Sequence, residues 1–131
     1  MRRMIYVSKA TIGDDVAQLD AIVVESVARN TSVGVTGMLW FDGTRFAQVL
    51  EGDHDPIGST MDRIARDRRH RNVEIILDRP IAHRMFATWA MMRADDSESA
   101  TLSTSFLVGF ARSLHTEAGR RLYEIALASY D

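Results

Sequence analysis

The fold is decided by a stretch whose sequence is NTSVGVTGMLWF at residues 30–41 and, after a short break, RFAQVLEG at residues 45–52. Both segments are apolar and rich in residues that favour β-strands. Asp42-Gly43 between them is a strong signal for a tight turn. Together the two segments predict a β-hairpin.

One residue of this hairpin does not fit an apolar strand. Side chains alternate along a strand, so Gln48 points to the same side as Phe46 and Leu50, toward the expected core. A buried amide that lacks a hydrogen-bond partner costs about 1–3 kcal/mol. The sequence therefore requires a polar partner for Gln48.

The segments on either side of the hairpin complete an alternating pattern of strands and helices. They are a strand at 4–8, a helix from the Asp15–Gln18 capping box to about Arg29, a helix after the N-cap Asp55 and Pro56, a strand at 73–78 and a less regular strand at 86–92. The order β-α-β-β-α-β-β predicts an α+β fold. We expect a ferredoxin-like βαββαβ sheet with an added fifth strand and two helices on one sheet face.

The end of the chain is expected to form a C-terminal helical pair. Leu102, Phe106, Phe110 and Leu114 recur at helical spacing, and Thr116 can cap a second helix. We therefore divide the chain into a domain at 1–93 and a helical cap or oligomerisation segment at 94–131. The apolar residues of this segment can cover the open face of the sheet or join a second subunit, and the pattern leaves both open. They include Phe106, Phe110, Leu122 and Tyr130.

Composition excludes several classes of protein. The 131 residues contain no cysteine, which excludes disulfides and thiolate metal sites and fits a cytoplasmic protein. A net charge of −2 argues against nucleic-acid binding, and no apolar run approaches the roughly 20 residues of a membrane span. The four histidines lack metal-ligand spacing, and no phosphate-binding glycine loop or nucleophile elbow is present. The sequence therefore predicts neither a metal site nor an enzyme.

Two groups of polar residues remain. Tyr6 on the first strand could touch Gln48 if the two strands are neighbours, and spacing alone favours an ordinary buried hydrogen bond. The basic run Arg66–Arg71 fits a solvated helix end or an anion site, and the pattern alone favours the solvated end.

Several motifs change which of these interpretations is favoured. They are Ile5–Ser8, Arg29-Asn30 with Val35–Leu39, Phe46–Gly52, Asp67–His70 and Phe86–Met91. In this order and spacing they resemble the BLUF domain, a family of blue-light photoreceptors that hold an oxidised flavin noncovalently. The resemblance covers roughly residues 1–93, and the combination of Tyr6, Gly37 and the glutamine segment is specific.

The resemblance implies roles for individual residues. Tyr6 resembles the donor that gives an electron and then a proton to the excited flavin, and Gln48 resembles the glutamine that lies between this tyrosine and the flavin. Asn30 matches the asparagine that binds the isoalloxazine edge, and Arg29 precedes it at a position that varies in the family.

Further matches surround the expected ring. Ile22 and Ile64 occupy the positions that sandwich it, and the helix-end residues that lie along the flavin are Asp67, Arg69 and His70. Trp89 and Met91 match the two fifth-strand residues that exchange places near the glutamine, so they are the expected signal relay.

The implied activity is light sensing with FAD, or FMN, as cofactor. A rotated or tautomerised Gln48 would give a reversible red-shifted signalling state, which the fifth strand and C-terminal helices pass to a homodimer, a larger homo-oligomer or a separate signalling protein. We expect a short stand-alone sensor, or a sensor cut from a longer protein. The alternative is a small ferredoxin-like acyl-phosphate hydrolase that uses Arg29 and Asn30.

Overall fold

The computed structural model describes residues 1–13, 15–87, 89–93, 108–109, 111–112, 114 and 116–128, and of residues 89–93 and 126–128 it describes the backbone alone. The elements in chain order are β1 (Arg2–Ala10), α1 (Val16–Ser32), β2 (Thr36–Phe41), β3 (Arg45–Gly52), α2 (His54–Ala65), β4 (His70–Pro80), β5 (Trp89–Arg93) and α4 (Glu117–Ala128).

The strands form one five-stranded sheet in the order β4-β1-β3-β2-β5. The first four strands pair antiparallel, and β5 adds to the edge of β2 as a parallel strand. This arrangement confirms the predicted α+β, ferredoxin-like sheet with an added fifth strand. Because β1 and β3 are direct neighbours, the strands that carry Tyr6 and Gln48 lie side by side.

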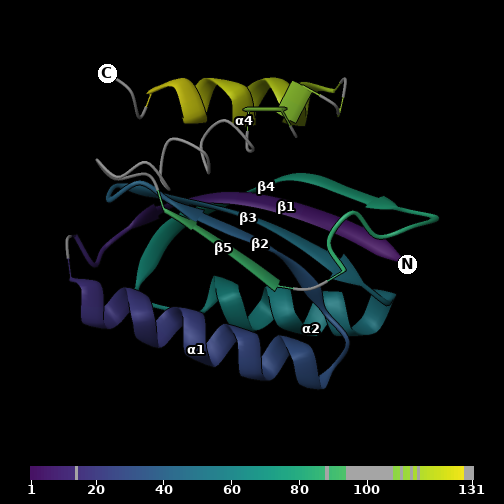
Figure 1. The fold of residues 1–131 in the computed structure, drawn as a ribbon, viewed down its shortest axis with the longest axis horizontal. Coiled ribbons are helices and arrows are strands. Elements are labelled where there is room, and N and C mark those ends of the chain that lie inside the picture. The colour runs from purple at the N-terminus through teal and green to yellow at the C-terminus, as the bar shows by residue number, and fades with distance from the viewer. Residues whose placement is uncertain are drawn as a thin grey trace.

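The sheet separates two helical layers (Figure 1). Helices α1 and α2 cover one face, as predicted, and α4 covers the other. Alternate residues of each strand serve the two faces: Tyr6 and Leu50 pack with α2, whereas Ile5 and Val49 belong to the core beneath α4. One sheet therefore has two buried faces.

The hairpin is confirmed as β2 and β3. In the turn, the Asp42 carboxylate accepts hydrogen bonds from the backbone N–H groups of Thr44 and Arg45, at 2.9 and 2.7 Å. Asn30–Ser32, the first residues of the quoted stretch, belong instead to the end of α1. The helix is longer than predicted because its last residues still make helical turns, with the Val33 N–H bonded to the Asn30 carbonyl.

The capping predictions have mixed outcomes. Asp15 caps α1 as predicted, with its carboxylate accepting from the Gln18 N–H at 3.1 Å. The prediction of Asp55 as the cap of α2 is wrong: the N-cap is Asp53, and Asp55 lies in the first turn. Pro56 is tolerated there because the first N–H groups of a helix have no partner within the helix.

The fifth strand starts later than predicted. Phe86 lies outside it: the Phe86 N–H donates to Glu51 Oε1 and the Phe86 carbonyl accepts from Thr36 Oγ1, so these two side chains hold the residue ahead of the strand. β5 begins at Trp89, opposite Gly37 of β2.

At the C-terminus, Thr116 caps α4 by accepting from the Gly119 N–H at 3.2 Å. Leu122 of α4 is fully buried in the core with Trp40 of β2. This packing uses Leu122 to cover the sheet, one of the two alternatives that the pattern left open. The preceding helix predicted from Leu102 to Leu114 lies largely outside the described residues, as do Phe106, Phe110 and Tyr130.

Candidate functional site

The centre of the site is a hydrogen bond between two buried side chains on neighbouring strands. The β1–β3 register places Tyr6 directly opposite Gln48, and the Tyr6 hydroxyl donates to Gln48 Oε1. Burial raises the pKa of Tyr6 far above its ordinary value, and the negative charge of Asp67 adds to this effect. The phenol is therefore held as a neutral hydrogen-bond donor. This contact supplies the polar partner that the sequence requires for Gln48.

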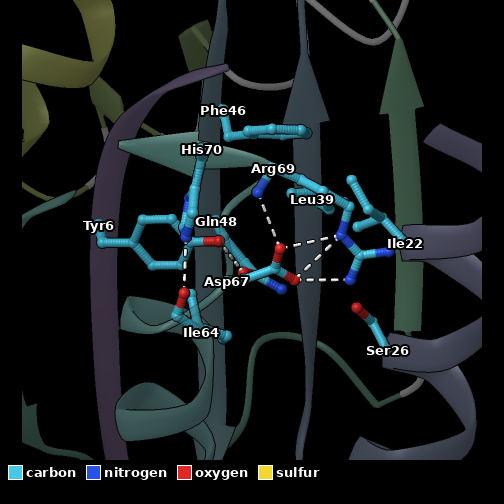
Figure 2. A pocket seen from close by; sticks show the side chains of 10 residues that line it. All are labelled: Tyr6, Ile22, Ser26, Leu39, Phe46, Gln48, Ile64, Asp67, Arg69 and His70. Carbon is cyan, nitrogen blue, oxygen red and sulfur yellow. Dashed lines mark hydrogen bonds and ion pairs between the residues drawn. The ribbon is translucent and has the colours of Figure 1, made fainter. Parts of the chain in front are cut away.

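The pair lies in the wall of a pocket with about 360 Å³ of space between atoms, a volume that includes the solvent at its mouth. The pocket lies between the sheet and the two helices of the same face (Figure 2). Its lining residues are Tyr6, Ile22, Ser26, Leu39, Phe46, Gln48, Ile64, Asp67, Arg69 and His70. The structure thus brings together seven of the predicted cofactor-binding residues: Tyr6, Ile22, Gln48, Ile64, Asp67, Arg69 and His70.

Two isoleucines border the pocket from different helices. Ile22 comes from α1 and Ile64 from α2, and in Figure 2 Gln48 and Asp67 lie between them. Below them the strands contribute Leu39 and Phe46 as an apolar floor. This arrangement gives a slot with apolar sides and a polar group, Gln48, at its base.

An ionic cluster contributes Asp67 and Arg69 to the lining of the slot. Arg69 donates to both oxygens of Asp67 and, through Nη2, to Glu25 Oε2 of α1 at 2.9 Å. The Arg69 guanidinium lowers the pKa of Asp67, and the Asp67 carboxylate raises the pKa of Arg69. The cluster therefore links α1 to the turn between α2 and β4 by opposite charges.

His70 is fixed from both sides of its ring. Its Nε2 lies 2.6 Å from the carbonyl of Ile64, which can only accept, so Nε2 carries the proton. In the neutral ring Nδ1 then accepts from the Ser8 hydroxyl at 2.8 Å. The ring also meets Tyr6 edge-on, at a centroid distance of 5.9 Å. His70 thus ties β1, α2 and β4 together behind the tyrosine.

Asn30 and Arg29 are placed differently from the other predicted residues. Asn30 is buried at the end of α1, and its Oδ1 accepts from Arg63 Nη2 of α2 at 3.1 Å. Neither Asn30 nor Arg29 lines the pocket, and Arg29 is exposed. Burial and the nearby charge of Arg29 lower the pKa of Arg63.

The predicted relay residues lie on β5. In the parallel β2–β5 pairing, Trp89 is opposite Gly37 and Met91 is opposite Leu39. Leu39 in turn pairs with Gln48 on β3, so Met91 occupies the same row of the sheet as the glutamine. The side chains of Trp89 and Met91 lie outside the described residues.

Sequence reasoning missed some residues of the site. Ser26 lines the pocket one helical turn after Ile22, a spacing that could have identified it. Ser8 lies two residues after Tyr6 on β1, so the sequence places both on one face of the strand, but it does not predict the bond from Ser8 to His70. Arg63 gives no such signal, because its contact with Asn30 depends on how α1 and α2 pack.

The described residues contain no group of three or more histidine, aspartate and glutamate side chains that could hold a metal ion. In the same part of the chain, no helix combines the length and apolarity that crossing a bilayer needs. What the site offers is a phenol–amide pair beneath an apolar slot with charged groups across it. Such a site suits a flat, partly polar ligand.

Comparison with known proteins identifies relatives. The family model "BLUF: Sensors of blue-light using FAD" matches residues 1–92. Photoactivated adenylate cyclase subunit beta of Euglena gracilis is 29% identical over 106 residues, which cover 79% of this chain and 12% of that protein. The chain thus spans about an eighth of the length of that relative.

Two solved structures share the fold. Klebsiella pneumoniae BlrP1 with FMN and cyclic diGMP is 27% identical, with a TM-score of 0.75 over 96% of this chain and 34% of that one. The BLUF protein BlrB in its dark state is 24% identical, with a TM-score of 0.74 over 95% of this chain and 91% of that one. The second likeness shows the fold alone.

Proposed function

The chain belongs to the BLUF family of blue-light sensors, and from this we propose that its pocket holds a flavin whose photochemistry is reported by the Tyr6–Gln48 pair. The observation that carries the proposal is the hydrogen bond between these two buried side chains at the base of the slot. The match gives no support to an acyl-phosphate hydrolase, and neither Arg29 nor Asn30 lines this pocket.

The residues present fit a flavin. Ile22 and Ile64 offer apolar sides for a flat ring. Gln48 offers the edge of such a ring an amide with both donor and acceptor atoms. Asp67, Arg69 and His70 are the polar residues along the remaining wall. Asn30 does not line the pocket and its Oδ1 is bonded to Arg63, so we propose that this contact changes when flavin binds.

Light supplies the driving force. A flavin excited by blue light is a strong oxidant. Tyr6 is a buried phenol with its O–H directed at Gln48 Oε1, so it can release an electron and pass its proton along that bond. While the phenol lacks its proton, Gln48 would lose the donor that fixes its carboxamide, so the amide could rotate or tautomerise before the electron and the proton return to Tyr6. A rearranged amide would present different hydrogen-bond atoms to a bound flavin ring, and this change would give the red-shifted state.

Downstream steps are proposed from position. Gln48 and Leu39 pair across β3 and β2, and Leu39 pairs with Met91 of β5. We propose that the rearranged amide acts on β5 through this row, with Trp89 and Met91 as the relay. The signal would leave the domain through α4, to a second copy of this chain or a separate signalling protein.

The flavin is proposed to be FAD, as the family description states. FMN is the alternative, since the similar BlrP1 structure is described with FMN. Heat release of the flavin followed by chromatography against both standards decides between them.

The test of the function is the absorption spectrum of the purified protein. We expect a yellow protein whose flavin band shifts to the red in blue light and returns in darkness. A colourless protein that takes up neither added FAD nor added FMN would overturn the proposal.

A further inference from the structure

A buried carboxylate lies at the end of β3, outside the pocket. Glu51 follows Gln48 along the strand but points to the opposite face, the one covered by α4. It is fully buried, and Arg3 opposite it on β1 forms an ion pair with Glu51 Oε2 at 2.7 Å. A buried charge needs such partners, because an isolated one is costly.

Arg3 is not the only partner of this carboxylate. Glu51 Oε1 accepts from the backbone N–H groups of Met85 and Phe86, at 2.9 and 2.7 Å. These residues lie in the connection that runs from β4 to β5. Glu51 therefore fixes the approach to β5 by charge-assisted hydrogen bonds, which are stronger than neutral ones.

The same connection is held from its other side. Arg84 donates to the Thr36 hydroxyl at 2.7 Å, to the Glu51 carbonyl at 2.9 Å and to the Gly34 carbonyl at 2.7 Å. The Thr36 hydroxyl in turn donates to the Phe86 carbonyl at 2.6 Å. Residues 84–86 are thus tied to the end of β3 and the start of β2.

We propose that Glu51 is a positioning residue for β5. It acts on neither flavin nor Tyr6, but it sets where β5 begins along β2. Because Gln48 and Glu51 belong to one rigid strand, a displacement of β3 at the pocket is carried to residues 85–86 and then to β5. The proposal rests on β5 being the relay of the proposed light response.

The experiment is hydrogen exchange by mass spectrometry on the flavin-bound full chain, in darkness and in blue light. In Glu51→Gln, residues 86–93 should exchange about tenfold faster in darkness than in the wild type, and their light-dependent change should be lost. The flavin red shift should persist, because the Tyr6–Gln48 pair is intact.

Arg3→Gln is the matched control. It removes the counter-charge of Glu51 but leaves the carboxylate bonded to the two backbone N–H groups, so the loss of stability should be spread over the whole protein. Relative to the other peptides of the same variant, exchange at 86–93 should therefore rise less than about threefold. A merely structural role for Glu51 predicts equal effects of the two substitutions. Equal effects, or no faster exchange at 86–93 in Glu51→Gln, overturn the proposal.

A second variant decides the matter if Glu51→Gln does not fold. Glu51→Asp keeps the negative charge but shortens the side chain by one methylene, which pulls the carboxylate back from the Met85 and Phe86 N–H groups, and it should accelerate exchange at 86–93 selectively. Acceleration spread over all peptides would contradict the proposal. Exchange in darkness does not depend on photochemistry, so a wild type without a red shift would refute the light response and leave this measurement valid.

Discussion

Tyr6 and Gln48 face each other across the β1–β3 ladder, and the tyrosine hydroxyl donates to the glutamine Oε1 inside the core. The contact joins the one phenol of the pocket to the one carboxamide that lines it. Register therefore fixes the pair before any ligand binds, and the first predictions concern these two side chains.

Substituting either Tyr6 or Gln48 should abolish the normal photochemistry and leave flavin binding intact. Tyr6→Phe deletes the donor and Gln48→Leu deletes the acceptor, while both keep the size of the side chain and the apolar slot. We expect flavin to remain bound and the normal reversible red shift to be lost, as measured by absorption under blue light. A normal red shift in either variant would contradict the roles assigned here.

The raised pKa of Tyr6 predicts an alkaline limit to stability. A phenol in the unfolded chain ionises near pH 10, whereas burial keeps Tyr6 neutral in the folded protein. The free energy of unfolding should therefore be unaffected by this group below about pH 10 and should fall as the pH rises further.

Tyr6→Phe lacks the phenol hydroxyl and serves as the control for the wild type. Urea unfolding from about pH 8 to about pH 11 should show a steeper decline in the wild type than in the variant. Parallel curves for the two proteins would show that Tyr6 ionises equally easily in both states.

The ion pair between Glu25 and Arg69 should slow the exchange of flavin, because it links α1 to the α2–β4 turn across the pocket. Both side chains are partly exposed, so the pair is worth no more than about 1 kcal/mol, or roughly a fivefold change in rate. We expect Glu25→Gln to release flavin up to about fivefold faster on dilution, followed by flavin fluorescence.

Salt and a distant ion pair provide the controls. High salt should reduce the difference between Glu25→Gln and the wild type, because it screens exposed charges. Glu117→Gln breaks the pair with Arg120 inside α4, away from the pocket, and should leave release unchanged. An unchanged rate of flavin release in Glu25→Gln would show that the Glu25–Arg69 pair does not slow release.

Two glycines should respond in opposite ways to alanine. At Gly37 an added Cβ would lie 1.8 Å from the Val49 carbonyl oxygen, so Gly37→Ala must force β2 from β3 and should cost several kcal/mol or prevent folding. At Gly58 in α2 the nearest atom is 3.7 Å away, and Gly58→Ala should stabilise by about 0.5–1 kcal/mol. Thermal unfolding of both variants measures this, and comparable stabilities would contradict the close approach at Gly37.

The sequence predicts best those features that depend on neighbours in the chain. The hairpin, the Asp15 cap and the inward direction of Gln48 follow from turn chemistry and from the alternation of strand side chains. The error at the start of α2 is also local: Asp53 and Asp55 both suit a cap, and only the path of the chain after β3 decides between them.

Features that depend on distant segments were not predictable in this way. Asn30 gave no sign of its contact with Arg63, because that bond requires α1 and α2 to be packed together. The later start of β5 likewise depends on Glu51, which binds the backbone of residues far along the chain. The roles of Tyr6 and Gln48 needed the resemblance to a family, since spacing alone favours an ordinary hydrogen bond.

Both faces of the sheet are buried, one under α1 and α2 and the other under α4, and this limits how the protein can be re-engineered. On β3, Gln48 faces the pocket while Ala47 and Val49 face the core under α4. One inserted or deleted residue before Gln48 would exchange these rows and place the carboxamide in an apolar layer. Variant libraries that tune the response should therefore substitute residues within the strands and vary chain length only at turns such as Asp42–Thr44.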